Sequence, residues 1–308
     1  MEREVGTSDT RKQVTRIRSL WLILLLPAGL SLLPAQQSGP AWLEVARAER
    51  LMDRSEYGLA IQTLRWALVA APNDPHALFG LGRAYRAIGD LDVAVDYFTR
   101  TLDHSERFVV PDERLLVRYE LAAIHRERRD FARYQHELLA ILADDPIPDD
   151  RAIPGVERQL AAQGIDRFLV LYRLPESGST AARGMLGELF VGLGQYRSAA
   201  QHASLAVLQT MTTVIEAAIR RDPTYQFSTI SDLMGRIGRY PEVQAYLDQS
   251  RLNQDLYYLA AAFWGEQQQV ARSIWQSLAT IDPDGEWGVR AVRQLADPQP
   301  EPLLVPTR

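Results

Sequence analysis

Five histidines are the side chains of this chain best suited to acid–base or metal chemistry, and their spacing supports neither. No two of them lie four residues apart and no HExxH sequence occurs, so the ligand spacing of a zinc peptidase is missing. The GxSxG of serine hydrolases and the GxxxxGK[ST] phosphate loop are absent as well. The five are His76, His104, His125, His136 and His202. We therefore predict a protein that is not an enzyme and that has no cofactor.

One acidic cluster has the residue types of a calcium site. Asp144-Asp145 and Asp149-Asp150 flank two prolines and supply carboxylates, which are the ligands that calcium prefers. No glycine stands at the EF-hand offset and no glutamate ends the loop in register. We expect helix capping and a solvated turn there, and no metal site.

Composition limits the fold and the partners. The chain has 308 residues, 46% of them hydrophobic and 24% charged, and it lacks the alternating β-branched runs of strands. This pattern predicts an all-helical fold. The absence of cysteine excludes disulfides, thiolate catalysis and cysteine-ligated metals. A net charge of −5 argues against nucleic acid, which needs a basic footprint.

The N-terminus has the pattern of an export signal. Four basic residues (Arg11, Lys12, Arg16 and Arg18) precede the apolar run 20–33 and then Pro34-Ala35. This run has 14 residues, fewer than the roughly 20 that a spanning helix needs. We predict a signal peptide over 1–35, a linker over 36–40 and location in the bacterial periplasm or cell envelope. The alternative is an uncleaved anchor in the inner membrane, with the rest of the chain facing the periplasm.

A helical hairpin at 75–107 organises the rest of the chain. Apolar residues recur with helical spacing over 77–88 and again over 91–102, and Gly89-Asp90 between them predicts a tight turn. The small Gly82 is expected to face Ala94, with Tyr85 and Phe98 alongside. Neither helix can bury its apolar face alone, so the two are expected to pack as a pair.

This hairpin resembles the tetratricopeptide repeat, a helix-turn-helix unit of 34 residues. Its signature offsets are occupied by Leu81, Gly82, Tyr85, Ala94 and Phe98. The preceding stretch is in register, because Ala48, Ala60 and Pro72 stand 34 residues before Gly82, Ala94 and Glu106. Further signature matches are Leu186, Gly187, Phe190, Ala199, Ala271 and Pro283. The glycines at 184, 187, 192 and 194 look superficially like a phosphate loop, but the repeat accounts for Gly187 and Gly194.

The resemblance implies an α-solenoid of about six stacked hairpins. Repeats one to three cover 41–146, a divergent helical spacer covers 147–179, and repeats four to six with a capping helix cover 180–297. The second helix of repeat four is expected to be overlong, running from 198 to 221. Trp66 and Trp275 are expected in the core, and the proline-rich tail 298–308 is expected to be disordered.

The resemblance also implies a binding surface, because the first helix of each repeat lines a groove in this family. The positions that face the ligand are His76, Phe79, Arg83 and Arg86 in repeat two, and Tyr119 and Arg126 in repeat three. Arginines beside aromatic rings suit an acidic peptide or a C-terminal carboxylate. For each arginine, a solvated face paired with nearby acids is the alternative. The lysine and asparagine of the known carboxylate clamp are missing.

These observations predict a non-catalytic scaffold or adaptor of the cell envelope that binds a protein or peptide partner. One alternative is a chaperone-like assembly factor for outer-membrane or peptidoglycan machinery. Another is an enzyme whose site is spread over 147–179 and 198–221.

Overall fold

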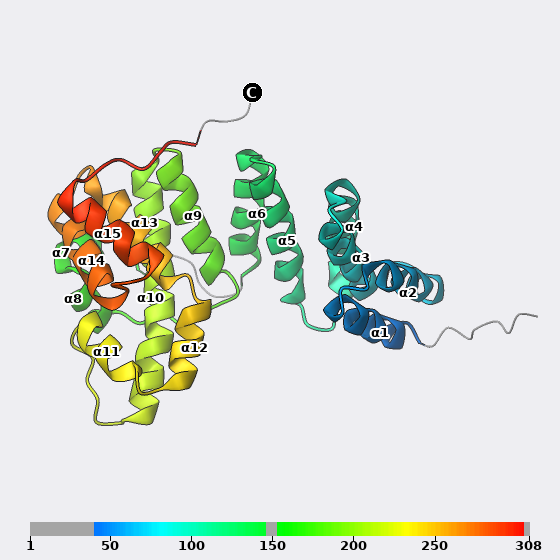
Figure 1. Cartoon of the computed structure of the whole chain (residues 1–308), viewed down its shortest axis with the longest axis horizontal. Coiled ribbons are helices and arrows are strands. Elements are labelled where there is room, and N and C mark those ends of the chain that lie inside the picture. The colour runs from blue at the N-terminus through cyan, green and yellow to red at the C-terminus, as the bar shows by residue number, and fades with distance from the viewer. Residues whose placement is uncertain (1–39, 146–152, 305–308) are drawn as a thin grey trace, which may run out of the picture. The chain divides into compact units, whose positions relative to one another are not determined.

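The computed structural model describes residues 40–145 and 153–304, and within them the chain is helical without β-strands (Figure 1). The predicted signal peptide and most of the linker lie outside these residues. The helices of the first half are α1 (Ala41–Asp53), α2 (Tyr57–Ala70), α3 (Pro75–Ala87), α4 (Leu91–Asp103), α5 (Glu113–Glu127), α6 (Phe131–Asp144), α7 (Val156–Gln163) and α8 (Ile165–Leu171). Those of the second half are α9 (Thr180–Gly192), α10 (Tyr196–Arg221), α11 (Ile230–Ile237), α12 (Pro241–Gln249), α13 (Leu252–Trp264), α14 (Gln268–Ile281) and α15 (Glu286–Ala296). None of these helices is long and apolar enough to cross a membrane.

The same turn closes four of the helix pairs. One residue takes a positive φ, and the N–H that follows it donates to the carbonyl of the residue five positions earlier, which is the Schellman pattern. The positive-φ residues are Ser55 between α1 and α2, Gly89 between α3 and α4, Arg129 between α5 and α6, and Gly194 between α9 and α10. Each second helix therefore folds back on its first.

The pairs pack in chain order. Helices α1 to α6 each contact the next, α6 then contacts α9, and the order continues through α10, α13, α14 and α15. The expected α-solenoid of helical hairpins is therefore present.

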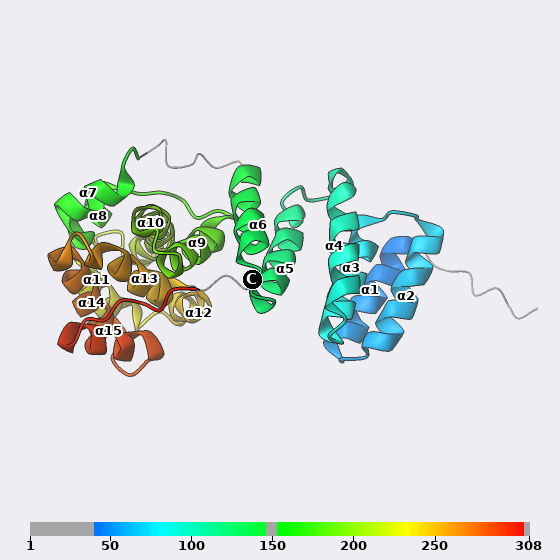
Figure 2. The same ribbon diagram turned by 90° about the horizontal axis from the view of Figure 1, so that it is seen from above.

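Two short pairs lie outside this order. The spacer helices α7 and α8 pack against α10, as Figure 2 shows, and α6 contacts α9 directly. Helices α11 and α12 form the fifth expected hairpin. This hairpin lies beside the main order, because α11 packs on α10 and α14 while α10 contacts α13 directly. The overlong α10 gives both short pairs a surface to pack on. Among the described residues, five hairpins follow the main order, and α15 follows them.

Most of the signature residues lie in the core. The buried ones are Ala48, Ala60, Leu81, Gly82, Ala94, Phe98, Leu186, Gly187, Phe190, Ala199 and Ala271. Tyr85 is half-buried, stacks on Tyr97 and accepts a hydrogen bond from Arg65 at 2.6 Å. Pro72 and Pro283 lie exposed in turns. Burial of the small residues brings paired helices close together.

One packing prediction differs from the structure. A Cβ added at Gly82 would lie 2.5 Å from the Phe98 ring, so the predicted close approach at Gly82 includes this ring. Trp275 is buried as predicted, but Trp66 is 39% exposed, because it lies on the face of α2 turned away from α1 and α3. Helical spacing alone does not reveal which face of α2 its neighbours leave uncovered.

The C-terminal segment also differs from the prediction of disorder over 298–308. Residues 297–304 have no regular secondary structure, yet their backbone is hydrogen-bonded to the helices. The N–H of Gln299 donates to Gln294 Oε1 at 2.8 Å, and that of Leu304 donates to the carbonyl of Gly192 at 2.7 Å. Prolines prevent a helix here but leave an extended chain able to dock. Residues 305–308 lie outside the described part.

Candidate interaction surface

Helix α3 carries four of the predicted binding residues on one side. Its first turn is fixed by Asp74, whose carboxylate accepts from the N–H groups of His76 and Ala77 at 2.9 and 3.0 Å, and by Pro75 at the first helical position. His76 lies 3.5 Å from a carboxylate oxygen of Glu113. His76 therefore helps to join α3 to α5.

The half-buried Phe79 and the exposed Arg83 form a pair one turn further along α3. The Arg83 guanidinium carbon lies 5.8 Å from the centre of the Phe79 ring, and that ring lies 5.8 Å from Phe98. Phe98 is fully buried, whereas the Arg83 side chain is exposed. The ring thus supports a guanidinium that remains free to meet a ligand.

Arg86 differs from Arg83, because it forms an ion pair with Glu120 of α5. The two side chains are 35% and 24% exposed. For this arginine the alternative interpretation holds: it is paired with a nearby acid and ties repeat two to repeat three.

A cavity of about 360 Å³ lies beside these two arginines. The end of α1, the start of α2, the end of α3 and the middle of α5 line it. Its lining consists of Met52, Asp53, Tyr57, Arg83, Arg86, Ala87 and Glu120.

Sequence reasoning missed Asp53, Tyr57 and Glu120 as members of this surface. A signal for part of it was present, because Met52, Arg86 and Glu120 follow one another at intervals of 34 residues. Equivalent positions of successive repeats therefore meet at the cavity. No comparable spacing pointed to Tyr57.

Tyr119 and Arg126 take part in a different contact, between α5 and α9. The Tyr119 hydroxyl donates to the carbonyl of Gly178 at 2.7 Å and accepts from the N–H of Ala182 at 3.0 Å. Burial raises the pKa of Tyr119 to about 12, so its hydroxyl stays protonated as this donor. The structure therefore places Tyr119 in a joint between helices, apart from the cavity beside α3.

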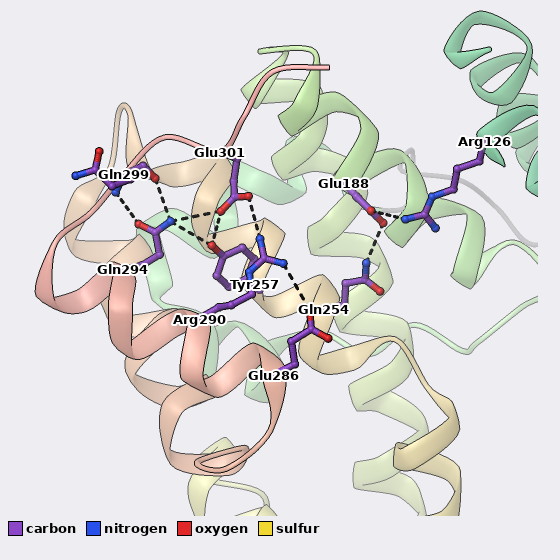
Figure 3. Close-up of polar contacts among 9 residues, drawn as sticks. All are labelled: Arg126, Glu188, Gln254, Tyr257, Glu286, Arg290, Gln294, Gln299 and Glu301. Atoms are coloured by element: carbon purple, nitrogen blue, oxygen red, sulfur yellow. Dashed lines mark hydrogen bonds and ion pairs between the residues drawn. The ribbon is translucent and has the colours of Figure 1, made fainter. Parts of the chain in front are cut away.

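Glu188 of α9 gathers the remaining charges of this joint, as Figure 3 shows. Its carboxylate accepts from Arg126 at 2.7 Å and from Gln254 at 3.0 Å, both drawn in Figure 3, and from Arg251 at 2.9 Å. Asp255 lies beyond Arg251, 3.4 Å from its Nε and 2% exposed. Burial raises the pKa of Asp255 to about 7. Arg126 is thus bound to a carboxylate of the chain itself.

Where the acidic cluster is described, its carboxylates bind groups of other segments, instead of forming the solvated turn that the sequence predicts. Asp144 accepts from Arg118 at 2.9 Å, and Asp145 accepts from the N–H of Ser179 at 3.1 Å. Asp149 and Asp150 lie outside the described residues. Within 40–145 and 153–304, no group of three or more histidine, aspartate or glutamate side chains has the arrangement of a metal site.

The glycines of α9 are accounted for by close packing. An added Cβ would lie 2.3 Å from the Asp255 carboxylate at Gly184, 3.0 Å from Ala203 at Gly187 and 2.7 Å from Leu304 at Gly192. Gly194 has a φ of +70° in the turn. Each glycine thus lies against a neighbour or in a turn, which leaves no reason to assign a phosphate loop.

The sequence model of the tetratricopeptide repeat family matches residues 45–106. This range takes in α1 to α4, the two hairpins whose signature residues stand 34 apart. This part of the chain carries tetratricopeptide repeats. Repeats of this type suggest a protein-interaction scaffold.

A relative of the repeat protein is found in Treponema pallidum (strain Nichols). It is 23% identical over 229 residues, which are 72% of this chain and 61% of the relative. The chain therefore spans less than two thirds of the length of that protein, whose own function is uncharacterized.

Proposed function

We propose that this chain is a non-catalytic scaffold that binds an acidic peptide or protein segment at the cavity beside α3. The observation that carries the proposal is the cavity of about 360 Å³ with the exposed Arg83 on its rim. It lies within the part of the chain that matches the repeat family.

The charges of the cavity lining define the complementary ligand. Arg83 is held by an aromatic ring and presents a planar donor fork to solvent, which suits a carboxylate. Arg86 is neutralised by Glu120, so it adds little attraction. Asp53, in the same cavity lining, supplies negative charge. It favours a ligand that carries a cationic or hydrogen-donating group close to its own carboxylate.

The location that we propose is the periplasm or the cell envelope. The basic residues, the apolar run and Ala35 at the N-terminus support export. Mass spectrometry of the N-terminus from the native host tests it. A mature chain that starts near Gln36 supports a cleaved signal, and an intact N-terminus in the membrane fraction supports an anchor.

The binding site is tested with one charge reversal and a matched control. A partner is captured from envelope extract on the full chain and purified, and its affinity is then measured by calorimetry. Arg83→Glu is expected to weaken binding by about tenfold, because a charge-assisted contact becomes repulsive. Arg133→Glu changes an arginine that is 71% exposed on α6, away from the cavity lining, and should leave affinity unchanged. Equal affinity of both variants would show that the cavity is not the site.

A chaperone-like role in envelope assembly is the second candidate, and exposed apolar side chains on the first hairpin favour it. Trp42 and Val69 are 68% and 78% exposed, and Leu43 and Leu59 are exposed as well. Such a surface suits an unfolded client. Suppression of the aggregation of an unfolded outer-membrane protein by the full chain, and its loss in Trp42→Ser with Val69→Ser, would favour this role over a fixed-partner scaffold.

A further inference from the structure

The last described segment of the chain lies across three helices as a peptide ligand would. After α15 ends, residues 297–304 run extended past α15, α13 and α9. Figure 3 shows Gln299 beside Gln294, and Glu301 between Tyr257 and Arg290. The segment is thus held by side chains that lie far from one another in the sequence.

Gln294 recognises the backbone of this segment. Its Nε2 donates to the carbonyl of Gln299 at 3.0 Å, and its Oε1 accepts from the N–H of the same residue at 2.8 Å. A side-chain amide that pairs with both main-chain groups of one residue selects an extended backbone and does not depend on its side chain. Gln294 itself is 8% exposed, which fixes its position.

Glu301 supplies the charge that is recognised. Its carboxylate accepts from Arg290 at 3.0 Å and from the Tyr257 hydroxyl. The Arg290 guanidinium carbon lies 4.4 Å from the centre of the Tyr257 ring and 4.7 Å from that of Trp287. The rings hold the arginine in place, so these helices present a pre-formed carboxylate site.

The chain's own segment fits this site incompletely. Gln299, Pro300, Pro302 and Leu303 remain exposed, Leu303 by 61%. A cavity of about 150 Å³ lies where residues 299–301 face Val191, Trp264 and Trp275. The buried indole N–H of Trp275 has no hydrogen-bond partner among the described residues. A larger side chain at the position of Pro300 would bury apolar surface that proline leaves uncovered.

We propose that α9, α13 and α15 form a binding site for an extended acidic segment of a partner protein, and that residues 298–304 occupy it as an internal competitor. The partner places a glutamate on Arg290 and Tyr257 and a bulky apolar side chain beside Trp264 and Trp275. Because the internal segment is tethered, its effective concentration is on the order of millimolar, and it excludes weak ligands. The proposal deepens the scaffold function but does not depend on the cavity beside α3.

The test empties the site in the full chain and offers a labelled peptide in trans. Glu301→Ala with Leu304→Asp removes the charge contact and places a charge where Leu304 meets Gly192. The probe is the peptide DPQPEPLLVPTR, followed by fluorescence anisotropy. We expect the doubly substituted chain to bind it at least about tenfold more tightly than the natural chain does. A peptide with Pro300→Phe should bind several-fold more tightly again.

Charge exchange identifies the contact. Arg290→Glu in the emptied chain should abolish binding of the natural peptide, and a peptide with Glu301→Arg should restore it. Arg293→Glu, an exposed arginine on the same helix, is the matched control and should have no effect. A folded, emptied chain that binds neither the natural nor the Pro300→Phe peptide would overturn the proposal and make the segment a fixed part of the fold. Because the Arg83→Glu experiment uses another surface, either proposal can fail alone.

A second measurement covers the case in which the emptied chain does not fold. The natural sequence has no cysteine, so Leu303→Cys gives a single labelling site in an otherwise natural chain. A dye at this exposed position should change its emission when excess Pro300→Phe peptide displaces the segment. No change at saturating peptide would likewise overturn the proposal.

Discussion

Arg86 of α3 and Glu120 of α5 lie 34 residues apart and form an ion pair between equivalent positions of adjacent repeats. Arg86→Glu alone replaces this attraction with repulsion and is expected to lower the free energy of unfolding by about 1 kcal/mol. Arg86→Glu combined with Glu120→Arg should recover most of the loss. A double-mutant cycle in urea measures the coupling. A coupling energy of zero would mean that solvent screens the pair completely.

The turns between paired helices give a prediction about backbone strain. Gly89 has a φ of +84°, whereas Gly58 in α2 has no positive φ, and an added Cβ meets nothing within 4 Å at either site. Gly89→Ala is therefore expected to lower the free energy of unfolding by about 1 kcal/mol through backbone strain alone. Gly58→Ala should raise it by roughly 0.5 kcal/mol, because alanine favours the helix. Equal effects in thermal unfolding would contradict the assigned turn.

The repeats were predictable because their signals are local. The turn at Gly89-Asp90 and the spacing of Leu81, Gly82 and Phe98 all fall within one 34-residue unit, and each hairpin forms through contacts that are close in sequence. Which face of a helix is covered depends on how the hairpins pack on one another. For that reason the exposure of Trp66 was not predicted.

The docking of the C-terminal segment was not predictable for a related reason. Composition described residues 298–308 correctly as proline-rich, but Glu301 meets Tyr257 across 44 residues and Leu304 meets Gly192 across the width of the last repeats. No periodicity connects these positions.

Of the candidate binding residues, Arg83 and Arg86 reach the cavity beside α3. Tyr119 and Arg126 instead join α5 to α9, through partners that no repeat offset specifies.

The packing of α9 against α13 gives a third prediction. An added Cβ at Gly184 would lie 2.3 Å from the buried Asp255 carboxylate, whereas at Gly235 in α11 it would meet nothing within 4 Å. Gly184→Ala should therefore lower the free energy of unfolding by about 1–3 kcal/mol, and Gly235→Ala should not lower it. Urea denaturation followed by circular dichroism measures both. Equal stability of the two variants would show that α13 moves freely away from α9.

His202 gives a prediction about pH. Its ring lies 5.6 Å from that of Phe190, and burial, with a smaller effect of Arg183, lowers its pKa from 6.5 to about 4. The folded chain therefore keeps this imidazole neutral where the unfolded chain protonates it. The stability that it contributes is complete above pH 6.5 and is lost as the pH falls toward 4.

His202→Gln removes this titration and should make stability less sensitive to acid. Between pH 7 and pH 4.5 the natural chain is expected to lose about 1–3 kcal/mol more of its free energy of unfolding than the variant does. His136→Gln, which changes an exposed histidine, is the matched control and should follow the natural chain. Burial raises the pKa of Asp255, so its protonation stabilises the folded chain as the pH falls. This effect is the same in all three chains and therefore cancels from the difference between them. Urea midpoints at several pH values test this, and parallel curves for all three chains would show that His202 is protonated equally in the folded and unfolded states.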